Sequence, residues 1–397
     1  MATGSCLLNT LWLLMVTSMT SPLSPEAPGI SWPASRVTER IGIDHAIVQG
    51  PFGGGLSSVE LTVAVSEAGG LGSFGVHHLD AAGITAVAAE LHAATSRPFA
   101  LNLWVSNHDA PEHEMTRARF DAAVTRLRPL YDEVGVEAPP YPARFSPSFE
   151  EQAAAVLEAA PTVFSFVFGV PDARVLAAFR ERGITTFGTA TTADEAVALD
   201  EAGVDVVVAS GAEAGGHRGA FLAPAEDSLV GTLPLVRAVV AEIEAPVVAA
   251  GGIADARGVV AALALGAEGV QLGSAFLATE ESGARPEHRA LLRGAGATHT
   301  RLTRAFSGRL ARGIPNRLMN DLTNDGPIEP YPYQGYLLKP VLAAARAQGR
   351  TDVVALWSGQ GTAVLEHRDA RGLYDALVRG TEALLSSNTT TLEGASR

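Results

Sequence analysis

The stretch "PVVAAGGIADARGVVAALALGAEGVQLGSA" at residues 246–275 contains two strand patterns separated by one helix pattern. The runs at 246–252 and 269–275 are short, apolar and end in small residues, whereas 255–268 begins with an acidic residue and is rich in alanine. Strands that are apolar without alternation are buried on both faces, as in a parallel sheet covered by helices. The stretch therefore predicts one β-α-β unit.

Similar apolar runs precede this unit, and alanine-rich helical patterns separate most of them. Eight units favour a closed (β/α)8 TIM barrel over an open doubly wound sheet, and we expect the barrel to span residues 37–280. The predicted strands are 46–50, 70–75, 99–105, 163–169, 185–190, 205–211, 246–252 and 269–275.

Other segments lack this alternation of strand and helix patterns. Residues 106–150 are rich in His, Pro and charge, and predict a lid or an added pair of helices. Residues 281–345 predict a small appended subdomain that is mainly helical, and 346–397 predict C-terminal helices that return to the barrel before a polar tail. Residues 1–36 predict a disordered or artefactual leader.

The leader contains the apolar run "LLNTLWLLMVTSM" at 7–19, so a signal peptide or membrane anchor is the alternative. No Lys or Arg precedes Arg36, although a secretory signal carries a basic start, and the run is short for a bilayer span. Met15 and Met19 are further candidate start sites. A leader without structure is the favoured interpretation.

The net charge of −14 and the pI of about 5.2 argue against nucleic acid or an anionic membrane as a partner. Cys6 is the single cysteine, which excludes an intrachain disulfide framework and a multi-cysteine metal site. This cysteine usage favours a reducing cytoplasm. A homo-oligomer is left open by these properties.

Glycine-rich turns follow the last two predicted strands, where TIM barrels commonly bind phosphate. Gly251 and Gly252 let backbone N–H groups approach an anion, and Gly273 and Ser274 add donors at a helix start. The alternative is a pair of ordinary tight turns. The sequence "QGPFGGG" after the first strand has the wrong spacing for a dinucleotide fingerprint, so a single terminal phosphate is the expected ligand group.

In "SGAEAGGHRG" at 210–219, His217 lies between glycines that remove side-chain bulk around the imidazole. A metal ligand is disfavoured because no partner stands at i+4 or in a nearby HxH. A simple turn residue is the alternative to a catalytic base or proton donor, which we expect. Arg218 is expected to point outward as a surface or interface charge. His77 and His78 are weaker candidates for lining the same pocket.

Several motifs along the chain resemble the nitronate monooxygenase family, formerly called 2-nitropropane dioxygenases. They are "IVQGPFGGG" (47–55), "LNLWVS" (101–106), "EAGGHRG" (213–219), the paired glycine turns within 246–282 and "GRLARGIPNR" (308–317). The resemblance covers residues 37–365. It implies an FMN-dependent TIM barrel that oxidises alkyl nitronates, and in some members neutral nitroalkanes, with O2 to carbonyl compounds and nitrite.

The resemblance also implies roles for single residues, with His217 as the catalytic residue. Gln49 and Gly50 would lie near the isoalloxazine, and Asn102 would bond to the flavin ring. Together with Gly251 from the turn pattern, the expected cofactor-binding residues are Gln49, Gly50, Asn102, Ser210, Gly215, Gly252, Gln271, Leu272, Gly273 and Ser274. Gly359 and Gln360 resemble a family element that returns toward the cofactor.

Two positions depart from the family pattern. Phe52 stands where the family usually has Met, and Ser210 stands where relatives often have Gln. Two other functions also remain open. A related FMN-dependent enoyl-acyl-carrier-protein reductase would share the barrel and use NAD(P)H, and a non-catalytic barrel could bind a phosphorylated ligand, because one fold hosts many functions.

Overall fold

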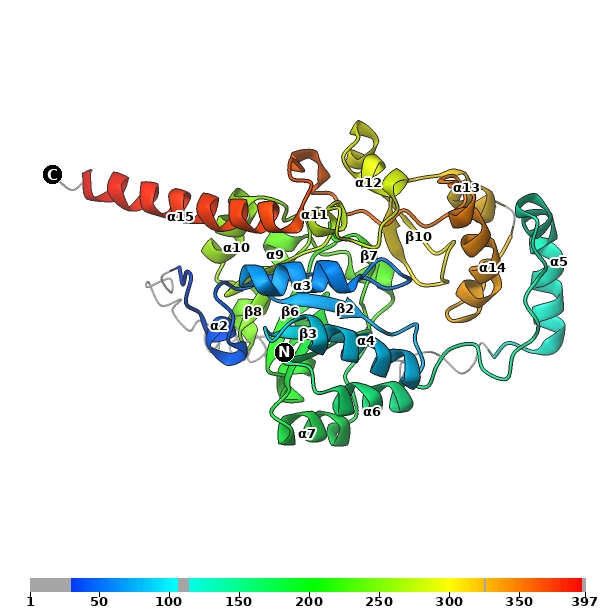
Figure 1. Ribbon diagram of the computed structural model, residues 1–397, viewed down its shortest axis with the longest axis horizontal. Helices are drawn as coiled ribbons and strands as arrows, with labels where there is room; N and C mark the ends of the chain where they lie inside the picture. The colour runs from blue at the N-terminus through cyan, green and yellow to red at the C-terminus, as the bar shows by residue number, and fades with distance from the viewer. Residues whose placement is uncertain (1–29, 106–113, 325, 395–397) are drawn as a thin grey trace, which may run out of the picture. The chain divides into compact units, whose positions relative to one another are not determined.

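The computed structural model describes residues 30–105, 114–324 and 326–394 (Figure 1). The described residues from Ser31 onward belong to one compact unit. Nearly all of the predicted leader, and residues 106–113 of the predicted lid or helical pair, lie outside the described residues. No helix within the described ranges is long and apolar enough to cross a membrane.

Eight parallel strands form the central sheet, in the order β1-β9-β8-β6-β5-β4-β3-β2. The two ends of this order also meet, because Leu71 N donates to Ile47 O at 3.0 Å and Gln49 N donates to Leu71 O at 2.9 Å. The sheet closes into a ring, so the predicted TIM barrel is confirmed. The strands are β1 (Ile47–Gln49), β2 (Gly72–Gly75), β3 (Phe99–Trp104), β4 (Val163–Val167), β5 (Thr185–Ala190), β6 (Val206–Ser210), β8 (Val247–Ala250) and β9 (Gly269–Leu272).

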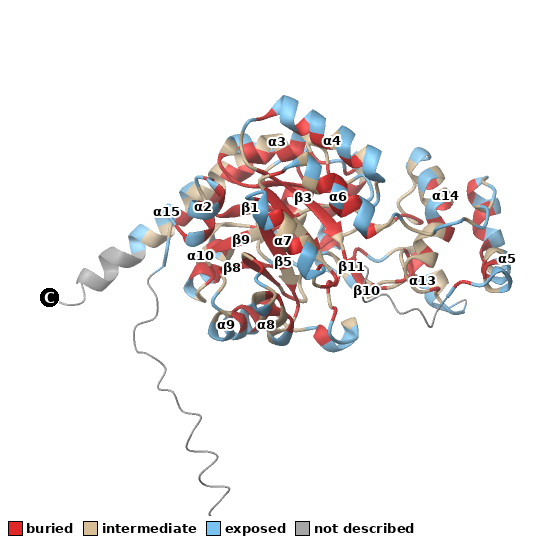
Figure 2. Ribbon diagram, turned by 90° about the horizontal axis from the view of Figure 1, so that it is seen from below, coloured by how far each residue is buried: buried red, intermediate tan, exposed pale blue. Residues whose placement is uncertain are grey.

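Helices surround the strands, and Figure 2 shows the buried strands inside a ring of helices with exposed outer faces. Polar side chains cap the starts of most of these helices: Ser58 accepts from Leu61 N at 3.0 Å, and Asp80 accepts from Gly83 N at 2.9 Å. The barrel helices are α3 (Val59–Ala68), α4 (Ala81–Ala94), α6 (Phe149–Ala159), α7 (Ala173–Glu181), α8 (Ala193–Glu201), α9 (Thr232–Glu242), α10 (Ala256–Ala264) and α11 (Ser274–Leu277).

The short helix α2 (Arg36–Ile41) covers the amino-terminal end of the barrel. Val37 belongs to a buried cluster with the barrel strands. Arg36 pairs with Glu268, just before β9, and Arg40 pairs with Asp205, just before β6. Because α2 occupies this end, the carboxyl ends of the strands are the end that can carry a site.

A second hydrophobic core lies outside the barrel and is built by α5 (Arg117–Val134), α13 (Arg317–Asn324) and α14 (Tyr333–Ala347). Tyr131 of α5 is buried, and its hydroxyl donates to Leu337 O at 3.0 Å. The helix within the described part of 106–150 is therefore α5, which packs with α14 of the later segment, whereas α6, which follows, packs against α4 on the barrel. The short helix α12 (Pro286–Leu292) precedes α13.

The last helix, α15 (Ala370–Gly394), packs against α3 and α10 on the barrel (Figure 1). Tyr374 is buried, and its hydroxyl lies 3.0 Å from His45 Nδ1. A Cβ atom at Gly380 would lie 2.6 Å from the Ala256 Cβ, so the glycine lets α15 approach α10 closely. Helix α15 thus packs on the outer face of the barrel.

The Glu329 carboxylate joins α5 to the segment before α14. It accepts hydrogen bonds from Arg119 Nε at 2.7 Å and Arg126 Nη2 at 3.2 Å, and its side chain is 5% exposed. We expect Glu329→Ala to lower the free energy of unfolding in urea by about 2 kcal/mol, because both arginines lose a buried partner but stay partly hydrated. Arg117→Ala, which breaks an exposed pair with Asp121, should cost less than about 0.5 kcal/mol. Equal losses in the two variants would contradict this account.

Candidate active site

A short strand, β7 (Gly216–His217), carries the predicted catalytic histidine beyond the carboxyl end of β6. It pairs with β11 (Ala311–Gly313), which in turn pairs with β10 (Arg301–Thr303), in an antiparallel sheet. The register places Ala311 opposite His217. Backbone pairing between distant segments therefore fixes the position of the histidine.

Aromatic rings enclose the His217 imidazole. Its centroid lies 4.7 Å from the Trp104 ring, 5.1 Å from Trp357 and 6.4 Å from Phe168. Its Nε2 atom lies 2.7 Å from Ser307 Oγ. Sequence reasoning singled out none of these four neighbours, although Trp104 follows Asn102 in "LNLWVS" and Ser307 directly precedes "GRLARGIPNR".

Burial, and to a smaller extent the positive charge of Arg309, lower the pKa of His217 to about 3. The Arg309 guanidinium carbon lies 3.8 Å from the centre of the Phe168 ring and 4.0 Å from that of Tyr331. These rings hold the cation close to the histidine. The imidazole is consequently neutral at neutral pH, and one of its nitrogen atoms carries a free lone pair.

His77 joins the same cluster, whereas His78 is exposed. The His77 ring stacks on Trp104 with centroids 3.9 Å apart and an interplanar angle of 8°. A Cβ atom at Gly53 would lie 1.9 Å from His77 Cε1, so a glycine is required there. Burial lowers the pKa of His77 well below its usual value. The loop after β1 and the end of β2 thus approach the site together.

The prediction that Arg218 points outward is wrong, because its side chain is buried. Its guanidinium donates to the carbonyl oxygens of Ser210, Thr191 and Ser228. Burial lowers its pKa to about 10, while the carboxylate of Glu195 favours the charged form. One guanidinium offers five donors, so it can pair several loop carbonyls that would otherwise be buried without partners. Arg218 therefore fastens the loop that carries His217.

The glycine turns have the geometry of an anion site. Gly251 and Gly252 adopt φ values of 109° and 72°, a left-handed region that favours glycine. The backbone N–H groups of Gly252, Gly273 and Ser274 donate no hydrogen bond to any described residue. A Cβ atom at Gly273 would meet Phe52 Cε1 at 4.0 Å and nothing nearer. Free amides beside open space can bind an anion.

The segment around Gly359 lies against these turns. Gly359 N donates to Ser274 Oγ at 2.8 Å, and Gln360 N donates to Glu213 O at 2.9 Å. A Cβ atom at Gly215 would lie 2.4 Å from Gly359 N, so the two backbones approach as closely as glycines allow. The structure thus brings the C-terminal element, the loop before His217 and the turn after β9 together.

Two predicted flavin contacts at the first strand also hold the barrel closed. Gln49 is buried, and its Oε1 accepts from Ser73 N at 2.8 Å. Gly50 N donates to Leu272 O at 2.9 Å, and the Leu272 side chain is fully buried. These residues therefore set the positions of β1, β2 and β9 relative to one another.

The other predicted contacts differ in exposure. Asn102 is buried, and its Nδ2 donates to Ser165 Oγ on β4 at 3.0 Å. The carbonyl oxygen of Ser210 accepts from Arg218. Gln271 remains partly exposed beside the β9 turn. All of these residues lie at the carboxyl half of the barrel, although Asn102 and Ser210 also serve its internal hydrogen bonding.

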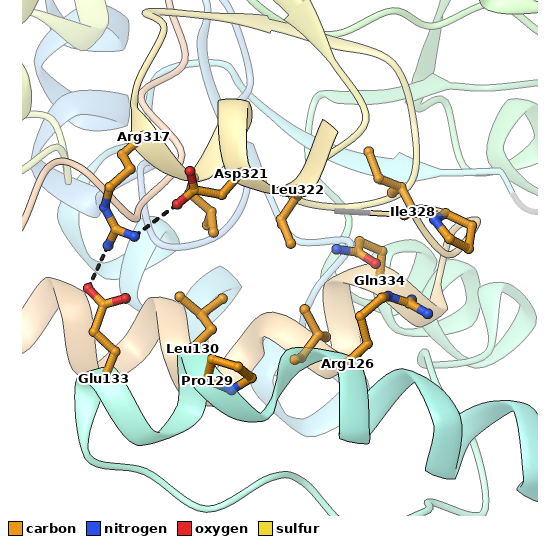
Figure 3. A pocket seen from close by; sticks show the side chains of 13 residues that line it. Arg126, Pro129, Leu130, Glu133, Arg317, Asp321, Leu322, Ile328 and Gln334 are labelled. Carbon is orange, nitrogen blue, oxygen red and sulfur yellow. Dashed lines mark hydrogen bonds and ion pairs between the residues drawn. The ribbon is translucent and has the colours of Figure 1, made fainter. Parts of the chain in front are cut away.

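Figure 3 shows a cavity between α5 and α13 that contains none of the predicted site residues. Its charges are paired with one another: Arg317 with Glu133 and Asp321, and Arg126 with the nearby Glu329. A second cavity is lined by residues of the histidine cluster and its loop, among them Phe168, Arg218, Arg309 and Leu310. The neutral imidazole and free amides favour the barrel end as the site of chemistry.

The family model for nitronate monooxygenase matches residues 34–379. The nitronate monooxygenase of Pseudomonas aeruginosa is 40% identical over 348 residues, which cover 86% of this chain and 98% of that protein. The chain belongs to the nitronate monooxygenase family. It is therefore an oxidoreductase of a flavin-dependent family, as the sequence motifs predicted.

Solved structures agree with this assignment. The nitroalkane oxidase of Streptomyces ansochromogenes is 35% identical, with a TM-score of 0.81 over 89% of this chain and 99% of that one. FabK from Thermotoga maritima is 25% identical, with a TM-score of 0.69 over 90% of this chain and 99% of that one. The reductase alternative, represented by FabK, is less similar and is not favoured.

The low pKa of His217 predicts how acid affects stability. The unfolded chain binds a proton near pH 6.5 and the folded chain only near pH 3, so the unfolded state is favoured as the pH falls through this window. One such group costs up to about 1.4 kcal/mol of unfolding free energy per pH unit. His217→Gln does not titrate, so its stability should fall less between about pH 6.5 and pH 5 in urea unfolding experiments. The exposed His299→Gln is the control and should follow the wild type. A His217→Gln curve parallel to the wild-type curve would contradict the low pKa of His217.

Proposed function

We propose that this chain oxidises alkyl nitronates with O2, and neutral nitroalkanes by the same site, to carbonyl compounds and nitrite, with FMN as cofactor. The observation that carries the proposal is a neutral, partly buried imidazole, His217, at the same barrel end as glycine turns with free amides. Family membership supplies the reaction class, and the site supplies the groups that the reaction needs.

The glycine turns suit the terminal phosphate of FMN. Three backbone amides, on Gly252, Gly273 and Ser274, are free to donate, and a phosphate dianion accepts several such bonds. The nearby Glu213 carboxylate is occupied, since it accepts from Thr232 N at 2.9 Å and Thr232 Oγ1 at 2.8 Å. Repulsion from that carboxylate is thereby reduced. Gln49, Gly50, Asn102, Ser210, Gly215, Gly251, Gln271 and Leu272 remain the proposed neighbours of the cofactor.

Bound FMN would accept electrons from the substrate and pass them to O2. The chain itself orients the substrate and moves the proton. Trp104, Trp357 and Phe168 form apolar walls around His217. In a neutral nitroalkane, the α-C–H bond breaks, its electron pair forms the C=N bond of the nitronate, and the proton passes to His217.

The low pKa of His217 is compatible with this role. The imidazole is unprotonated wherever the enzyme works, so no prior loss of a proton is needed. As the C–H bond breaks, negative charge develops on the nitro oxygens and stabilises the imidazolium that forms beside them. A nitronate substrate has already lost its α-proton, so His217 does not need to remove one, and the site only has to bind and orient the substrate.

Gly273 allows a direct test of the phosphate site. Its φ and ψ are −97° and −83°, and its surroundings leave room for a side chain, so Gly273→Asp should fold. The added carboxylate would repel the phosphate, and we expect the ratio of flavin to protein absorbance to fall by about tenfold or more. Gly273→Ala is the steric control and should retain most of its flavin. Mass spectrometry of the released flavin should show FMN. Full occupancy in the aspartate variant, or FAD in the wild type, would refute this site.

His217→Asn separates proton abstraction from binding. The variant should retain its fold and flavin but lose kcat/KM for nitroethane by about 100-fold or more, the usual contribution of a general base. Oxidation of ethyl nitronate should fall much less, because that proton is already absent. His299→Asn, at an exposed position, is the control and should resemble the wild type on both substrates.

Equal losses on nitroethane and ethyl nitronate would instead assign His217 to binding of the nitro group. Unchanged rates on both would reduce it to a turn residue.

A further inference from the structure

We propose that Ser307 is a positioning residue that fixes the tautomer of His217, with the proton on Nε2 and the lone pair of Nδ1 left for the substrate. The proposal rests on the proposed role of His217 as the base. It concerns a side chain that reaches His217 from a loop 90 residues later in the chain.

The hydrogen bonds at Ser307 favour one tautomer. Its Oγ lies 2.7 Å from His217 Nε2, accepts from Arg309 N at 3.2 Å and donates to Arg309 O at 3.4 Å. A hydroxyl group has one donor and two acceptor positions. When its proton is on Arg309 O, its two lone pairs are filled by the Arg309 N–H and the His217 Nε2–H. With the proton on Nδ1 instead, Nε2 could only accept, so the Ser307 hydroxyl would have to donate to Nε2. Its hydrogen bond to Arg309 O would then be lost.

The other edge of the imidazole is open. His217 Nδ1 makes no hydrogen bond to any described residue, and it is not among the buried polar atoms sealed from solvent. Trp104 and Trp357 lie 4.7 and 5.1 Å from the imidazole centroid and restrict a rotation that would exchange the two edges. The ring therefore has one edge held by Ser307 and one edge available to a reacting molecule.

The tautomer matters because a base must present a lone pair to the proton that it removes. With the proton on Nδ1, the open edge would present an N–H group and could not accept. Ser307 thus sets the fraction of enzyme that is ready to react without touching the substrate, much as the carboxylate of a Ser-His-Asp triad orients its histidine.

The pairing of the neighbouring strands holds Ser307 close to His217. Ser307 lies between β10 and β11, and β11 places Ala311 opposite His217 in the same small sheet. Thr303, the last residue of β10, offers a matched control, because its Oγ1 accepts from Ala305 N at 3.0 Å but makes no hydrogen bond to His217. Thr303→Val removes a hydroxyl of similar structural use while it leaves the histidine alone.

Nitrogen NMR of flavin-loaded enzyme labelled with 15N-histidine tests the tautomer directly, and His217→Asn identifies the relevant signals. We expect the wild type and Thr303→Val to show the Nε2–H tautomer of His217. Ser307→Ala should show a mixture of both tautomers, and Ser307→Thr should restore the wild-type pattern. An Nδ1–H tautomer in the wild type, or an unchanged pattern in Ser307→Ala, overturns the proposal.

Kinetics supply the second readout. Loss of one neutral hydrogen bond should lower kcat/KM of Ser307→Ala for nitroethane by about fivefold to tenfold, with ethyl nitronate oxidation within about twofold of wild type. Ser307→Thr should recover most of the loss. Equal effects on both substrates overturn the proposal. If the wild type oxidised neither substrate, the proposed function would fail, whereas the tautomer assignment would still be decided by the NMR spectra.

Discussion

Pairing of β7 with β11 is the constraint on which the rest of the site depends. The barrel supplies Trp104 and Phe168 at its strand ends, but His217 reaches them only because Ala311 lies opposite it in the small sheet. The same sheet brings Ser307 to one edge of the imidazole. The site is therefore composite: a TIM barrel provides the walls and glycine turns, and a segment outside the eight-stranded sheet completes the environment of the base.

Partial burial keeps His217 neutral, but removing polar groups from water costs free energy. An imidazole surrounded by rings cannot easily become charged, which keeps His217 neutral. The surrounding loops offset such costs with hydrogen bonds. Buried Arg218 donates to three carbonyl groups, and buried Glu195 accepts from Thr191 N at 2.7 Å. Polar groups near the site are thus fixed by partners, so the loop of His217 is held in one arrangement.

Much of this architecture could be predicted from the sequence. Apolar runs ending in small residues located all eight barrel strands, because buried parallel strands leave a continuous apolar signal. The glycine turns and His217 were also recognisable from local spacing. Ser307 and Trp357 were not, because their significance comes from contacts between segments far apart in the chain. Arg218 was misjudged for a related reason: its partners, such as Ser228, are backbone carbonyls that sequence patterns do not reveal.

The long separation between His217 and Ser307 has a consequence for biosynthesis. A ribosome extends the chain from its amino terminus, so all eight barrel strands are made before β11 exists. The base meets its hydrogen-bonding partner only after the nascent chain has passed residue 307, and Gly359 reaches the turn after β9 later still. A prematurely terminated chain could contain every barrel strand and yet hold no assembled centre. The environment of the base is therefore completed only after every barrel strand has been made.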